Sequence, residues 1–205
     1  MKKPVKVILI VLDVIAVLLI LAIAAYLTLA DHCWFLRVGD TALCIWNENT
    51  NTATVVGFGK LWDYEPPMVY GHVDYPSHGI APMVARGFTV EKAIICSGIT
   101  NVPGNLFGDC DVTELYIPAS VKEMDCTAFI ASRDITALHF GGDAPKFVYG
   151  GQDTTSDGSK PGNPLLKQLE DHAITIYYPP GAKGWDSPDW DGFQLVEQKY
   201  HVDWS

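Results

Sequence analysis

The chain contains 205 residues, of which 48% are hydrophobic, and it carries a formal net charge of −10. Three basic residues and one acidic residue precede position 31, so the remainder holds 11 basic and 23 acidic residues, a difference of −12. An acidic surface repels phosphate backbones, which argues against nucleic acid as a partner. The 13 prolines and 18 glycines are spread along the chain and favour many short elements joined by turns.

A long apolar run occupies residues 7–30 and reads VILIVLDVIAVLLILAIAAYLTLA. As a helix it would reach about 36 Å, against roughly 30 Å of bilayer hydrocarbon. Three lysines precede it: Lys2, Lys3 and Lys6. The positive-inside rule keeps these lysines in the cytoplasm. We therefore expect residues 1–30 to be a single transmembrane signal anchor, with the rest of the chain outside the cytoplasm at the cell membrane.

Two features of the apolar run leave alternatives open. Residues 22–24 (AIA) and 28–30 (TLA) fit a signal-peptidase pattern, so secretion after cleavage is the rival interpretation, although secretory apolar cores are usually shorter. Asp13 lies within the run, where a carboxylate costs roughly 2.5–3.5 kcal/mol on insertion scales. It either contacts a partner helix or is simply carried by a long apolar segment.

A repeat is visible in the middle of the chain when residues 90–110, 112–132 and 135–147 are laid over one another. The step is 22 residues and then 23, within the 20–29 residue period of leucine-rich repeats. The equivalent apolar positions are Val90, Val112 and Ile135, then Ala93, Leu115 and Leu138, then Ile95, Ile117 and Phe140. The last two positions of each unit lie two residues apart, so they face the same side of a strand. Each coil buries that side only by stacking on a neighbour.

Two stretches of this repeat resemble a known family. ITNVPGNLFGDCDVTELYIP (residues 99–118) and VKEMDCTAFIASRDITALHF (residues 121–140) are similar to the BspA-like leucine-rich repeats of bacterial cell-surface proteins. The pattern of that family is roughly I-x-x-I-x-x-x-A-F-x-x-C-x-x-L-x-x-I-x-I-P. This chain departs from it at Leu106, where the family prefers Ala, and at Ser132, where Cys is usual.

The resemblance extends to both sides of the repeats and covers most of residues 45–195. TATVVGFGKLWDY (residues 52–64) looks like the segment that often precedes such repeats. ITIYYPPGAKGWDSPDW (residues 174–190) looks like the strand and turn that often close them. The resemblance implies a mainly β fold, a short solenoid of parallel strands with few helical turns. It also implies a bacterial cell-surface protein that binds an extracellular or envelope protein.

These patterns divide the chain into three regions: an anchor (1–30), a β-rich capping region (31–88) and a leucine-rich-repeat-like module (89–205) with a polar insertion (150–165). Residues 42–46 and 53–58 are apolar or β-branched, and residues 47–51 between them are typical of a turn. We expect these residues to form a β-hairpin that caps the first coil. Residues 64–88 are rich in Tyr and Pro and are expected to form an irregular loop.

No catalytic motif is present: the sequence lacks G-x-S-x-G, H-E-x-x-H and a phosphate-binding glycine loop. The six histidines lack metal-ligand spacing, so we expect no metal, no cofactor and no enzymatic activity. Residues 153–158 begin like a calcium loop, but the twelfth position is Pro164 instead of Glu. An aromatic and acidic cluster comprises Trp185, Asp186, Asp189, Trp190 and Asp191. It leaves a carbohydrate-active envelope enzyme as an alternative.

The five cysteines are Cys33, Cys44, Cys96, Cys110 and Cys126. Their number is odd, so at least one has no partner within the chain. Cys33 and Cys44 could close a small loop outside the cell. Cys110 is expected to act as a small buried hydrophobic residue. The absence of a C-x-x-C motif gives no support to a redox or zinc site.

The strand positions between the inward-facing residues are the candidate binding residues, because solenoids use such open faces for partners. In this chain they are Glu114 and Tyr116 in one unit and Ala137 and His139 in the next. We expect Glu114, Tyr116 and His139 to be exposed there and to contact a protein ligand, so that the chain mediates binding or adhesion. The alternative from a different class is a structural or accessory subunit that assembles through its anchor.

Overall fold

A computed structural model describes residues 33–64, 83, 86–108, 110–125, 127–128, 132, 134–148 and 173–202. The expected transmembrane helix with Asp13, the insertion at residues 150–165, and Cys126 lie outside the described residues. Within the described part of the chain, no helix is long and apolar enough to span a bilayer.

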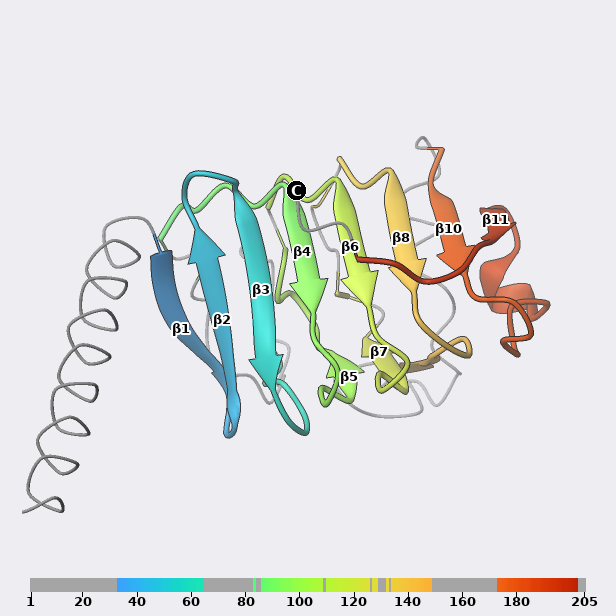
Figure 1. Ribbon diagram of the computed structural model, residues 1–205, viewed down its shortest axis with the longest axis horizontal. Coiled ribbons are helices and arrows are strands. Elements are labelled where there is room, and N and C mark those ends of the chain that lie inside the picture. The colour runs from blue at the N-terminus through green and yellow to red at the C-terminus, as the bar shows by residue number, and fades with distance from the viewer. Residues whose placement is uncertain are drawn as a thin grey trace, which may run out of the picture.

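Within the described residues, one eight-stranded sheet runs in the order β1-β2-β3-β4-β6-β8-β10-β11 (Figure 1). Its strands are β1 (Cys33–Gly39), β2 (Ala42–Asn47), β3 (Thr52–Gly57), β4 (Lys92–Ile95), β6 (Glu114–Ile117), β8 (Ala137–Phe140), β10 (Thr175–Tyr178) and β11 (Gln194–Glu197). The pairs β1–β2 and β2–β3 are antiparallel, and every later pair is parallel. The predicted stack of parallel strands and the predicted hairpin, here β2 and β3, are both confirmed.

The sequence analysis missed β1. Its residues alternate in the manner of a half-buried strand, with Leu36 and Val38 buried and Phe35 and Arg37 exposed. The run W-F-L-R-V is rich in β-forming residues and could have identified the strand. The capping region is therefore a three-stranded antiparallel unit that continues into the repeats, and the two share one core.

The repeat register is as predicted. Ala93 lies opposite Leu115, and Leu115 lies opposite Leu138, so equivalent residues of successive coils stack in line. Val90, Val112 and Ile135, the first apolar position of each unit, are all buried. Each parallel strand is followed by a return segment, because a parallel neighbour requires a crossover connection. The fold is therefore a short leucine-rich-repeat-like solenoid.

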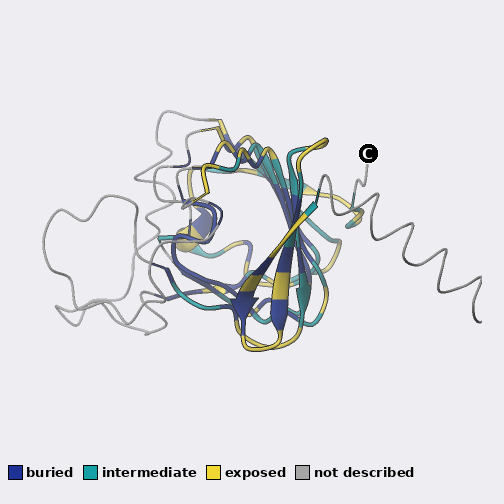
Figure 2. Cartoon of the chain, turned by 90° about the vertical axis from the view of Figure 1, so that its left-hand side faces the viewer, coloured by how far each residue is buried: buried dark blue, intermediate teal, exposed yellow. Residues whose placement is uncertain are grey.

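A second, three-stranded parallel sheet lies on the return side of the coils. It comprises β5 (Asn101–Val102), β7 (Glu123–Asp125) and β9 (Lys146–Val148) in the order β5-β7-β9. Val102, Met124 and Phe147 are in register across it and are buried. Viewed from the β1 side, the large sheet stands on one side of the interior and buried return segments lie on the other (Figure 2).

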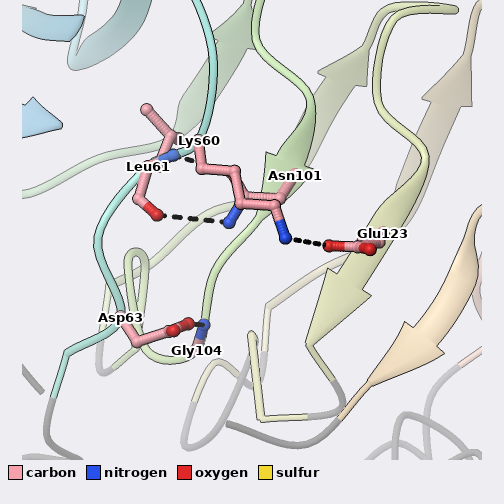
Figure 3. A network of polar contacts seen from close by, with 6 residues as sticks. All are labelled: Lys60, Leu61, Asp63, Asn101, Gly104 and Glu123. Atoms are coloured by element: carbon pink, nitrogen blue, oxygen red, sulfur yellow. Dashed lines mark hydrogen bonds and ion pairs between the residues drawn. The ribbon is translucent and has the colours of Figure 1, made fainter. Parts of the chain in front are cut away.

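Polar contacts attach the segment after β3 to the first repeat coil (Figure 3). The Asn101 side chain accepts from the Leu61 N–H at 2.7 Å and donates to the Leu61 carbonyl at 3.2 Å. Asp63 accepts from the Gly104 N–H at 3.1 Å. Lys60 Nζ lies 2.6 Å from Glu123 Oε2 on the next coil. The bonds of Asn101 and Asp63 give backbone groups of Leu61 and Gly104 their partners where no neighbouring strand supplies them.

Candidate binding face

The large sheet has an inner face on the core and an outer face, because successive side chains of a strand alternate. Strand pairing places one residue from every strand in a single line across the outer face. This outer row consists of Phe35, Ile45, Thr54, Ile94, Tyr116, His139, Tyr177 and Val196. The row is apolar or aromatic almost throughout, so the outer face presents a hydrophobic stripe that runs perpendicular to the strands.

The centre of the outer row is a stack of three rings. His139 lies between Tyr116 and Tyr177, with ring centroids 4.4 Å and 4.6 Å away and planes within 7° and 6° of parallel. The spacing follows from the separation of neighbouring strands, which is about 4.8 Å. The Tyr116 hydroxyl donates to Glu114 Oε2 at 3.1 Å. The stack therefore carries a carboxylate at one margin.

The environment of His139 favours its neutral form. Burial lowers the pKa of His139 below its ordinary value, and the nearby Glu114 carboxylate opposes that effect without reversing it. Desolvation has the larger effect on this pKa because aromatic rings cover the imidazole on both sides. At neutral pH the middle of the outer row is therefore uncharged, which suits an apolar partner.

The structure brings the three predicted binding residues together, but none of them is as exposed as expected. Glu114, Tyr116 and His139 all lie on the outer face, as predicted, and Glu114 and His139 are half-buried. Tyr116 is only 3% exposed, so the expectation of an open tyrosine there is wrong. The physical reason is a segment that crosses the outer face.

That segment, residues 198–202, follows β11 and is named the outer strap here. The Gln198 N–H donates to the Tyr178 carbonyl at 2.8 Å, and the chain then passes in front of β10 and β8 towards β6 (Figure 1). A Cβ built on Gly141 would lie 3.3 Å from Cδ1 of Tyr200, so the Tyr200 ring reaches the end of β8. Burial raises the pKa of Tyr200 to about 12, with further contributions from Cys96 and Tyr116.

Exposure changes along the outer row. Ile94 in the middle is 1% exposed, whereas Phe35 at the β1 end is 54% exposed. Leu43, the outward residue of β2 beside the row, is 44% exposed. Large exposed apolar residues that gather in one place are typical of interaction surfaces. The β1–β2 end of the outer face is therefore the accessible part of the stripe.

The tryptophans of the closing segment (residues 174–190) belong to the hydrophobic core. Trp185 and Trp190 are buried and pack on Phe140, with ring centroids 4.7 Å and 5.6 Å away. They end the solenoid by covering its last coil, and the 3₁₀ helix η1 (Pro188–Trp190) holds Trp190 in place. A shallow groove of about 600 Å³ beside this turn is lined in part by Asp186, while Asp189 and Asp191 lie outside it. The predicted carboxylates are thus not assembled in one groove.

The cysteines make no disulfide among the described residues. Cys33 lies opposite Asn47 in the β1–β2 register, and Cys44 points into the core, where its thiol lies 3.7 Å from the sulfur of Met83. The loop closed by Cys33 and Cys44 that the sequence allowed is therefore absent. Cys110 is a buried core residue, as predicted.

Of the outer row, the sequence analysis named only Tyr116 and His139, and among the residues it missed are Ile94 and Tyr177. It also missed Tyr200 on the outer strap. Ile94 follows from the repeat itself, because it lies between the inward-facing Ala93 and Ile95. Tyr177 would have followed from aligning the strand TIYY with ALHF, the preceding one. No local pattern marks Tyr200, since the outer strap lies outside the repeats.

No protein-family model matches this chain, and no curated protein matches it. Among solved structures it is similar to a leucine-rich repeat protein from Eubacterium ventriosum, with 13% sequence identity and a TM-score of 0.44. That alignment covers 80% of this chain and 44% of the other protein, so the chain spans less than half the length of that relative.

Proposed function

We propose that this chain is a non-catalytic binding protein, held at the outer side of a cell membrane by residues 7–30, whose recognition surface is the outer face of the large sheet. The observation that carries the proposal is the outer row, an almost entirely apolar or aromatic line that eight strands contribute in register. Flat faces of this kind suit a protein partner, because rigid aromatic side chains supply contact area at a low entropic cost.

The accessible contacts for a partner are at the β1–β2 end. Phe35 and Leu43 expose apolar side chains there, and Arg37 lies beside them on the same face. The part of the chain after residue 30 carries a net charge of −12, which favours partners with a basic surface through long-range attraction. We therefore expect an extracellular or envelope protein that combines an apolar patch with surrounding basic residues.

The proposal is tested with the full chain on intact cells. Protease shaving that removes a C-terminal tag without lysis would support the extracytoplasmic location. Adhesion of these cells to immobilised extracellular proteins is then compared between the wild type and Phe35→Asp/Leu43→Asp. The control is Phe58→Asp, because Phe58 is an even more exposed aromatic residue that lies outside the outer row.

Loss of adhesion in the double variant, with adhesion retained in Phe58→Asp, is the expected result. Equal adhesion of all three proteins would contradict recognition through the outer face. Protection of the tag until lysis would contradict the location. The accessory-subunit alternative would be favoured by a complex that persists in Phe35→Asp/Leu43→Asp but is lost when residues 7–30 are deleted.

A further inference from the structure

We infer that the outer strap is a built-in occupant of the recognition surface and that a partner gains the centre of the outer row only by displacing it. This inference rests on the proposed function, since it concerns the same face. It adds a named segment of the chain, residues 198–202, that limits access to that face.

The first observation is the burial of a residue that lies on the outer face of the large sheet. Tyr116 points away from the core and belongs to no part of the interior cluster, yet it is only 3% exposed. A residue on the outer face of a sheet reaches such burial only when another segment covers it. Neighbouring strands cannot do so, because they lie in the plane of the sheet.

The second observation is the position of Tyr200. Its ring lies against Gly141, and its pKa is raised by burial and by proximity to Cys96 and Tyr116, which lie on two different strands or their ends. The absence of a side chain at Gly141 leaves room for the ring: a Cβ there would already stand 3.3 Å from it. Tyr200 therefore fills a site shaped by the outer face.

The third observation is the burial pattern of the strap. Tyr200 and Val202 are half-buried, whereas Lys199 and His201 are exposed. This alternation is that of an extended segment with one face laid on a surface. A partner that replaces the strap would therefore be an extended peptide segment with apolar side chains at every second residue.

The strap is held by side chains. Beyond Gln198, no backbone hydrogen bond joins residues 199–202 to a strand within the described part of the chain. Displacement of the strap thus breaks apolar contacts without breaking a ladder of backbone bonds. Such contacts can be re-made in full by an incoming segment of the same chemistry, which makes exchange feasible.

The test uses the thiol of Cys96 as a reporter in the full-length protein in membranes. Cys96 is half-buried on the outer side, and burial raises its pKa. Maleimide labelling at Cys96 is followed by peptide mass, with Cys33 on β1 as the internal reference. The variants are Tyr200→Ala/Val202→Ala and the matched control His201→Ala, which alters the exposed side of the same segment.

We expect labelling of Cys96 to accelerate about fivefold in the double variant, because uncovering the thiol raises both its access and its thiolate fraction. Labelling in His201→Ala should match the wild type, and Cys33 should react equally in all three proteins. Unchanged labelling of Cys96 in the double variant would overturn the inference. An equal acceleration in His201→Ala would also overturn it, because the contact would then not be specific to one side.

Adhesion to the immobilised proteins separates this inference from the proposed function. Faster labelling together with stronger adhesion of Tyr200→Ala/Val202→Ala would support displacement. Faster labelling with unchanged or weaker adhesion would overturn it, since the uncovered residues would not be the recognition surface. If neither the wild type nor any variant adheres, the proposed function fails. The inference then fails with it, even if the labelling of Cys96 shows that the strap covers the sheet.

Discussion

The side chain of Asn101 pairs with both backbone groups of Leu61, a residue 40 positions earlier in the chain. The amide oxygen accepts one bond and the amide nitrogen donates the other, so Asn101 imitates the edge of a strand. Both residues are buried, and water cannot replace the pair. The contact joins the capping region to the first coil of the solenoid.

Asn101→Ala should therefore lower the free energy of unfolding by about 2–3 kcal/mol, because it leaves a buried N–H and a buried carbonyl without partners. Asn49→Ala in the exposed turn after β2 is the control and should change stability by less than about 0.5 kcal/mol. Urea unfolding followed by tryptophan fluorescence measures both. Equal stability of the two variants would contradict a structural role for the Asn101 pair.

Stability should depend on pH through His139. The folded-state pKa of His139 is lowered, so the unfolded chain binds its proton first as the pH falls through about 6.5. The contribution of His139 is therefore complete above that value and is lost as the pH falls towards the folded-state pKa. His139→Phe keeps a ring between Tyr116 and Tyr177 and should reduce the pH dependence between pH 7.5 and pH 5.

Unfolding midpoints across this pH range provide the measurement for His139. The control is His201→Phe, because His201 is an exposed histidine on the outer strap. This control should retain the slope of the wild type. A slope that persists unchanged in His139→Phe would assign the pH dependence to other groups.

Trp190 should be required for closing the last coil. Its ring contacts Phe140, Phe147 and Trp185, with centroids 4.7–5.6 Å away, and it is buried. Trp190→Ala should cost about 3–5 kcal/mol through lost burial and a cavity. The exposed neighbour Asp191→Ala should be nearly neutral. Thermal unfolding compares the two, and a mild effect of Trp190→Ala would mean that the segment is not part of the core.

The thiol of Cys44 should be inert in the folded protein. Burial raises its pKa to about 12, and the adjacent Cys110 adds to the effect. Native-state alkylation at pH 8 should modify Cys33 and spare Cys44, whereas unfolding should make both react. Peptide mapping without reductant gives the answer directly. A Cys33–Cys44 linked peptide would show that the disulfide allowed by the sequence does form.

The inner face of the solenoid could be predicted from the sequence because local spacing determines it. Val90, Val112 and Ile135 recur at nearly equal steps, and each coil repeats the same burial. The stack at the centre of the outer row follows from the same register, so Tyr116 and His139 could be placed on one face. The β1 strand carried a signal as well, in its run of β-forming residues W-F-L-R-V.

The coverage of that face could not be predicted. Tyr200 reaches Tyr116 across 84 residues of sequence, and a segment of five residues with period-two alternation has no feature that names its destination. Similarly, the burial of Trp185 and Trp190 depends on their packing against Phe140, which is distant in the sequence, so the sequence alone left a carbohydrate-active enzyme as an alternative. Local sequence patterns therefore could not predict the contacts between distant segments outside the repeat.

The strand β3 pairs with β2 in the antiparallel sense and with β4 in the parallel sense. The first three strands are joined by short turns, so their contacts have a low sequence separation, whereas each coil must close a loop of about twenty residues or more. Low contact order speeds folding. We therefore expect the β1–β2–β3 unit to form first and to act as a template, so that the coils assemble on it in order from one end of the chain.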